Sequence, residues 1–185
     1  MKKNFYILLL LFAMATASVD AQNTFVKGDK VVNVGIGFGS NLYTGGHFTS
    51  RFPPLSGSFE VGVKDELFDE KSSLGVGGYI GYTGAKYDEG GWGWKYSSFV
   101  IGPRAALHYQ LIDNLDTYGG IMLGYDVASS KAYGLTHWNS TYSAGGFAWS
   151  LFLGGRYYFS DNLAAMVELG YGIAYLNIGI AIKLK

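Results

Sequence analysis

The sequence predicts an all-β protein: a single eight-stranded, antiparallel, up-and-down β-barrel that crosses a membrane. Apolar and small residues alternate along the chain with a period of two, which places neighbouring side chains on opposite faces of a strand. The composition disfavours helices, because only 15% of the residues are charged while 17% are aromatic and 28 residues are glycine. After the N-terminal segment, no apolar stretch is long enough for a membrane helix.

The first 21 residues have the parts of a secretory signal peptide. Lys2 and Lys3 precede an apolar stretch at positions 5–15, and the small residue Ala21 ends the segment. The stretch is shorter than the roughly 20 residues that a spanning helix needs, which argues against an uncleaved anchor. We therefore predict cleavage after Ala21, export of the chain, and one β-barrel domain over residues 22–185.

Eight segments carry the alternation, in the order 32–39, 55–64, 74–83, 98–109, 115–125, 147–159, 162–171 and 176–184. Large apolar residues mark one face of each, for example Val34 and Ile36, Phe59 and Val61, Val76 and Ile80, Phe99 and Ile101, Ile121 and Leu123, Leu151 and Leu153, Val167 and Leu169, and Ile178 and Ile180. Long connections are expected at 40–54, 84–95 and 127–146, and short turns at positions such as Asp113-Asn114. Long loops at one end and mostly short turns at the other are typical of outer-membrane barrels.

The second face of the segments distinguishes a membrane barrel from a soluble, lipocalin-like one. It consists mostly of Gly, Ala, Ser and Asn, whereas a face in water would favour Lys, Glu and Thr. The interior of an eight-stranded barrel is just wide enough for side chains to fill, so we expect the small residues to point inward and the large ones toward lipid. Aromatic residues near the segment ends fit interfacial girdles: Tyr82, Tyr109, Tyr125, Tyr157, Phe159 and Tyr171.

A few ionisable residues fall on the face predicted to point inward: Glu60, Lys64, Arg104, His108, Arg156, Glu168 and Lys183. An unpaired buried charge is very costly, so these side chains are expected to pair or to form hydrogen bonds. We predict a structural ion-pair network in which Arg104 lies between Glu60 and Glu168, with no catalytic role. Pro103 lacks the N–H group that a strand ladder needs, and we expect a local bulge there.

The long connections contain histidines and aromatic residues that are candidates for surface recognition: His47, Phe48, Trp92, Trp94, His137 and Trp138. The alternative is that they pack over the mouth of the barrel or rest on lipopolysaccharide. The net charge of zero gives no electrostatic case for nucleic acid. Three scattered histidines and no cysteine predict neither a metal site nor a cofactor.

The signal peptide, the eight alternating segments and the stretches GPRAALHYQL, LDTYGGIMLGYD and VELGYGIAYLNIGIAIKLK resemble the small outer-membrane β-barrel family of OmpA-type transmembrane domains and OmpX-like proteins. The resemblance implies an integral protein of the cell outer membrane, in contact with outer-membrane lipids and lipopolysaccharide. It also implies help from periplasmic chaperones and the barrel-assembly machinery during biogenesis. One departure is the C-terminal sequence Ile182-Lys183-Leu184-Lys185, where such barrels often end on an aromatic residue.

These observations favour a monomeric barrel with a structural or surface-interaction role, in which the loops contact an unknown extracellular ligand. Two alternatives remain open at this point. A lipid A-modifying enzyme would use His47 with Ser40 or Ser50, or His137 with Ser140 or Ser143, although none of these pairs forms a motif. A narrow channel or ligand carrier would need more interior space than the inward side chains are expected to leave.

Overall fold

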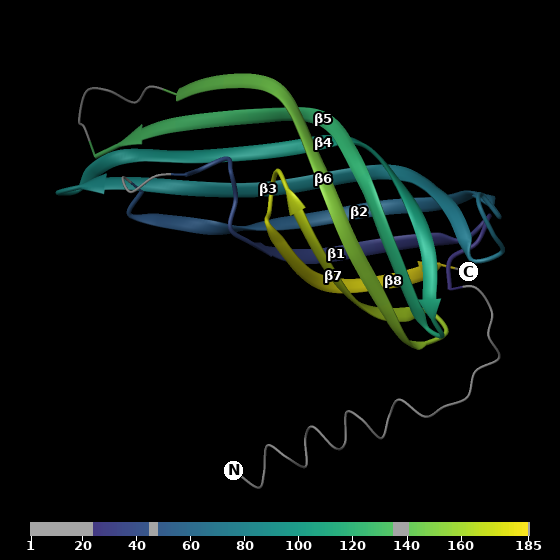
Figure 1. Cartoon of the computed structure of the whole chain (residues 1–185). Coiled ribbons are helices and arrows are strands. Elements are labelled where there is room, and N and C mark those ends of the chain that lie inside the picture. Colours follow the sequence, from purple (N-terminus) through teal and green to yellow (C-terminus); the bar gives the residue numbers. More distant parts are fainter. Residues whose placement is uncertain (1–23, 45–47, 135–140, 185) are drawn as a thin grey trace, which may run out of the picture.

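The structure, a computed structural model, describes residues 24–44, 48–134 and 141–184. Within these residues, eight strands pair in sequence order and close into a barrel (Figure 1). The strands are β1 (Lys30–Phe38), β2 (Ser50–Asp65), β3 (Ser72–Glu89), β4 (Trp92–Ile112), β5 (Leu115–Tyr133), β6 (Thr141–Ser160), β7 (Leu163–Tyr171) and β8 (Leu176–Leu184). The prediction of an eight-stranded, antiparallel, up-and-down barrel is confirmed. The predicted signal peptide lies outside the described residues.

The first and last strands close the ring. They pair along their whole length, from Lys30 opposite Leu184 to Phe38 opposite Leu176. A closed sheet has no edge strand with unpaired N–H and C=O groups, which is the condition for β-structure in hydrocarbon. In the part of the chain that the structure describes, no helix has the length and apolar character needed to cross a membrane.

The alternation in the sequence separates two faces of the sheet. Large apolar side chains point away from the barrel; Ile101 and Leu153, for example, are 51% and 71% exposed. Small and polar side chains, such as those of Asn33 and Ala106, are buried inside. An apolar exterior around a polar, filled interior is the arrangement expected of a barrel that faces lipid.

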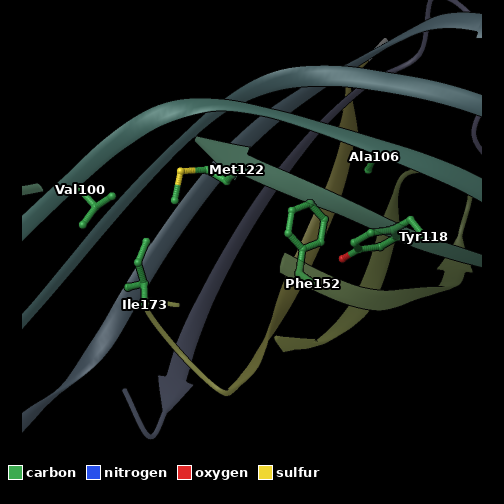
Figure 2. Packing of buried hydrophobic residues seen from close by; sticks show 6 residues of the cluster. All are labelled: Val100, Ala106, Tyr118, Met122, Phe152 and Ile173. Carbon is green, nitrogen blue, oxygen red and sulfur yellow. The ribbon is translucent and has the colours of Figure 1, made fainter. Parts of the chain in front are cut away.

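Two groups of side chains fill the interior. One consists of Val100, Ala106, Tyr118, Met122, Phe152 and Ile173, and Figure 2 shows the rings of Tyr118 and Phe152 side by side within it. The other consists of Phe25, Val31, Tyr158, Ala164 and Ala181. Because both groups are close-packed, the barrel has a core rather than an open lumen.

The segment before β1, residues 24–29, folds back into one end of the barrel. Gly28 N donates to Gly62 O at 2.8 Å, and Gly62 N donates to Asp29 O at 2.9 Å. Ser73 Oγ donates to Phe25 O at 2.9 Å, and the Phe25 ring is buried. The N-terminal segment therefore acts as a plug, which the sequence did not lead us to expect.

The strands differ greatly in length. β1, β7 and β8 have 9 residues each, whereas β3 to β6 have 18 to 21. About 9–11 residues are enough to cross a bilayer. In Figure 1, β3 to β6 continue well beyond the β7–β8 hairpin, and we call residues 83–89, 92–98, 128–133 and 141–146 the extended sheet.

The extended sheet corrects our prediction of loops at 84–95 and 127–146. β3 and β4 stay paired up to Glu89 opposite Trp92, and the two-residue turn at Gly90 and Gly91 has φ values of 62° and 94°. Two glycines with positive φ form the tight hairpin turn that matches strand twist. Both faces of the extended sheet lie outside the apolar band, so charged residues and glycines are found on either face. The alternation of apolar and small residues is therefore absent from this stretch of sequence.

The bulge predicted at Pro103 is absent. The register between β4 and β5 is the same on both sides of it, with Ile101 opposite Tyr125 and Arg104 opposite Met122. Pro103 itself keeps its place opposite Gly78 of β3. The register shift caused by proline lies instead in β2, between Phe52 and Leu55, where Pro53 and Pro54 follow each other.

Candidate functional site

Four ionisable side chains inside the barrel form a closed ring, which we call the tetrad: Glu60, His108, Asp116 and Arg156. His108 Nε2 lies 2.7 Å from Glu60 Oε1, and its Nδ1 lies 2.8 Å from Asp116 Oδ1. Arg156 Nη2 and Nη1 donate to the other oxygen of each carboxylate, at 2.5 Å and 3.0 Å. All four side chains are buried.

The geometry of the tetrad sets its charge. Both imidazole nitrogens of His108 face carboxylate oxygens, and a carboxylate only accepts hydrogen bonds, so each nitrogen carries a proton and donates a hydrogen bond. An imidazolium and a guanidinium then balance two carboxylates. Such a neutral, fully hydrogen-bonded cluster avoids most of the cost of burying charge. Sequence reasoning missed Asp116, although its inward position on the fifth segment was a signal.

A second ionic contact lies farther along the interior. Arg104 Nη2 donates to Glu168 Oε1 at 2.8 Å, and Tyr118 Oη donates to the same oxygen at 3.0 Å. The Arg104 guanidinium also stacks over the ring of Phe152, 4.1 Å from its centroid. Glu168 is thus held by one cation and one hydroxyl group.

The structure corrects the position predicted for Arg104. It does not bridge Glu60 and Glu168, because Glu60 forms its hydrogen bonds with His108 and Arg156. The two ionic groups are joined by neutral side chains. Arg104 donates to Ser58 Oγ at 3.2 Å, Asn33 Nδ2 donates to the same oxygen at 2.8 Å, and Arg156 Nε donates to Asn33 Oδ1 at 3.0 Å.

Two of the predicted interior cations lie elsewhere. Lys64 is exposed, because a register shift between Gly62 and Lys64 turns its side chain away from the interior. Lys183 lies near the end of β8 and pairs with Asp29 at 2.7 Å, where both side chains remain partly exposed. The ion pair between Lys183 and Asp29 connects the N-terminal plug to the last strand.

Aromatic side chains line the inward-pointing side of the extended sheet. Tyr87 lies opposite Trp94 in the β3–β4 ladder, and the ring of Trp94 lies 6.1 Å from that of Tyr142 on β6. Phe48 packs edge-on against Tyr96 at 5.7 Å. We call this surface the aromatic face; its members are Phe48, Tyr87, Trp92, Trp94, Tyr96 and Tyr142.

The aromatic face brings together three of the six residues predicted to take part in recognition: Phe48, Trp92 and Trp94. The other three, His47, His137 and Trp138, lie outside the described residues. The same holds for both histidines of the enzyme alternative. Tyr142 is 61% exposed, so the face is open at the β6 side.

On the other side of the extended sheet, a small polar cluster surrounds Asp88. Lys86 Nζ lies 2.6 Å from Asp88 Oδ2, and Tyr133 Oη donates to the same oxygen at 2.6 Å. These contacts, above all the one with Lys86, lower the pKa of the Asp88 carboxyl from its ordinary value to about 2. The same pair raises the pKa of Lys86.

Comparison with solved structures agrees with this architecture. The attachment invasion locus protein Ail of Yersinia pestis, in complex with the heparin analogue sucrose octasulfate, overlays with a TM-score of 0.54 over 85% of this chain and 96% of Ail. The fold is that of a small outer-membrane β-barrel. The sequence identity is 11%, so the likeness concerns the fold alone.

Two further structures resemble the barrel less closely. A second structure of Ail has a TM-score of 0.45 at 15% identity over 85% of this chain and 96% of Ail. A de novo designed transmembrane β-barrel has a TM-score of 0.44 at 19% identity over 85% and 97% of the two chains. No protein-family model and no curated protein matches the sequence.

A cavity inside the barrel, among the residues that the structure describes, is large enough for water. Its volume is about 30 Å³, and its lining combines apolar residues such as Met122 with the polar residues Arg104 and Asn177. Arg104 Nε and Asn177 Oδ1 have no hydrogen-bond partner among the described residues. About 10–15 Å³ is enough for one water molecule.

Proposed function

We propose that this chain is an integral outer-membrane barrel whose extended sheet and loops bind a partner at the cell surface. The observation that carries the proposal is the length of β3 to β6, which continue past the apolar band as a sheet with an exposed aromatic face. A membrane anchor alone needs no such extension. Exposed tyrosine and tryptophan side chains are the residue types that dominate protein recognition surfaces.

The likeness to Ail supports a role in binding at the cell surface. Ail is called an attachment and invasion protein and was captured with a heparin analogue, and it shares the barrel fold. The N-terminal signal peptide predicted for residues 1–21 and the apolar exterior support export to the outer membrane. Within the residues that the structure describes, no contact favours the lipid A-modifying enzyme or the channel, so surface binding is the function that we propose.

Membrane integration is tested by fractionating cells that express the chain and by heat-modifiable mobility on gels. We expect the protein in the outer-membrane fraction, with a folded band that shifts on boiling. A soluble periplasmic protein would contradict the proposal.

Recognition is tested with intact expressing cells on a glycan array that includes heparin. We expect retention by at least one probe and its loss in the Trp94→Ala/Tyr142→Ala variant. Phe68→Ala is a matched control, because Phe68 is 78% exposed in the β2–β3 connection at the opposite end of the barrel. Equal retention of the aromatic variant would remove the aromatic face from the proposal.

A further inference from the structure

Three lysines form a row across the outer side of the extended sheet. Lys86 of β3 lies opposite Lys95 of β4, and Lys95 lies opposite Lys131 of β5. Neighbouring strands are about 4.8 Å apart, so the row spans roughly 10 Å. All three side chains lie at outward positions of the alternation, and those of Lys95 and Lys131 are exposed.

The row is unfavourable for the sheet itself. Like charges directly opposite each other on neighbouring strands are destabilising. Asp88 neutralises Lys86, and the Tyr133 ring lies 4.9 Å from Lys86 Nζ and 5.5 Å from Lys95 Nζ. Within the described residues, no carboxylate forms an ion pair with Lys95 or Lys131. Among the residues that the structure describes, the ammonium groups of Lys95 and Lys131 thus form no ion pair.

The row occupies a defined level above the apolar band. On the outer side, Tyr82, Phe99 and Val127 form one cross-strand row, and Ser97, Ser129 and Ser143 form the next. The lysines form the third row, each four residues beyond the apolar residue of its own strand. Apolar, hydroxyl and cationic rows therefore follow one another in the order of a membrane interface.

The distances fit the headgroup layer. Four residues of strand rise about 13 Å, or roughly 9 Å along the bilayer normal for a strand tilted by about 45°. The polar layer on each side of the hydrocarbon is about 5–8 Å thick. The lysine backbones therefore lie at its outer limit, and their flexible side chains can reach back to the phosphate level.

We propose that the lysine row binds the phosphate groups of an anionic glycolipid in the outer leaflet, with Lys95 and Lys131 as the phosphate ligands. The inference rests on the proposed function in one respect, that the extended sheet emerges on the outer side of the membrane. An ammonium group is a good phosphate ligand, and the row offers two that form no ion pair with a carboxylate in the described part of the chain. Lys95 points in the same direction as Phe99 and the other lipid-facing residues. This direction favours a lipid over a soluble sulfated glycan as the ligand.

The test uses the barrel in zwitterionic nanodiscs, titrated with diphosphoryl lipid A and followed through the backbone amide signals of residues 95 and 131. The key variant is Lys95→Gln/Lys131→Gln. The control is Lys64→Gln/Lys71→Gln, which removes the same charge from two exposed lysines at the opposite end of the barrel. Each lysine near an anionic surface contributes about 1 kcal/mol, so we expect roughly 25-fold weaker binding for the key variant and wild-type binding for the control.

Two further arms identify the source of the anion. Dephosphorylated lipid A should bind weakly to the wild type, and added salt should weaken binding of the diphosphoryl form. The proposal is overturned by unchanged affinity in the key variant, by an equal loss in the control, or by equal binding of dephosphorylated lipid. Shifts at residues 95 and 131 with heparin but not with lipid A would assign the row to a soluble glycan instead.

Failure here is distinguishable from failure of the proposed function. The titration in nanodiscs requires neither a surface partner nor the aromatic face, and the glycan-array test does not depend on lipid A. Heat-modifiable mobility of each variant shows that it is folded. If the double variant does not fold, Lys131→Gln alone is titrated, with about a fivefold weaker affinity expected.

Discussion

The ring of Phe25 stacks on the imidazole of His108, with centroids 4.1 Å apart and planes inclined by 24°. Phe25 belongs to the plug before β1, and His108 belongs to the tetrad inside the barrel. The Arg156 guanidinium lies 5.8 Å from the same phenyl ring. The N-terminal plug therefore covers the ionic cluster and shields it from water at this end.

Phe25→Ala should destabilise the barrel by about 3–5 kcal/mol, because it removes a buried aromatic side chain and admits water to the tetrad. The measurement is equilibrium unfolding by urea in detergent micelles. Phe68→Ala, at an exposed position, serves as the control and should change the unfolding free energy little. Equal stability of wild type and Phe25→Ala would show that the plug does not contribute to the core.

Glu60→Gln should cost about 3–5 kcal/mol of unfolding free energy, because it leaves His108 and Arg156 facing a neutral amide in a buried site. The double variant Glu60→Gln/Arg156→Met should lose less than the sum of the two single variants, since it removes both partners. The four urea-unfolding curves form a double-mutant cycle. A coupling energy near zero would contradict the contact.

The membrane-spanning part of the fold could be predicted from the sequence because lipid imposes a strict pattern on it. Every second residue of β1, β7 and β8 faces lipid, so the alternation at Val34 and Ile36 or at Ile178 and Ile180 has few interruptions. The extended sheet has no such constraint. The sequence signal for the extended sheet was the Gly90-Gly91 pair, because a two-residue hairpin turn at this pair places Lys86 opposite Lys95.

The interior partners could be predicted as a set but not as pairs. Alternation correctly placed Glu60, Arg104 and Glu168 inside, because inward positions follow from the strand period. Which of them touch depends on side-chain direction and on hydroxyl groups such as Ser58, which lies between the two ionic groups. The prediction that Lys64 points inward was wrong because a single register shift reverses the face of every following residue.

Arg104→Met should lower stability by about 3–5 kcal/mol without creating a conducting pore. The loss comes from Glu168, whose remaining hydrogen-bond partner among the described residues is the Tyr118 hydroxyl. Conductance should stay at the baseline in planar bilayers, because Met122, Phe152 and Tyr118 still fill the interior. Arg104→Met/Glu168→Met should recover part of the lost stability. Steady currents in Arg104→Met but not in the wild type would mean that this ion pair closes a channel.

The contact between Lys86 and Asp88 should be sensitive to acid. The pKa of Asp88 is lowered from 3.8 to about 2, chiefly by its hydrogen bond with Lys86. Because the folded state binds this proton less readily than the unfolded chain, the contact contributes its full stabilisation above about pH 4 and loses it as the pH falls through about 2. Carbon NMR of the Asp88 carboxyl in nanodiscs measures the titration directly. Lys86→Gln should move the midpoint of the Asp88 titration up toward 3.8. Lys64→Gln, at the opposite end of the barrel, should leave the midpoint in place. An unchanged midpoint in Lys86→Gln would show that Tyr133 alone holds the carboxylate.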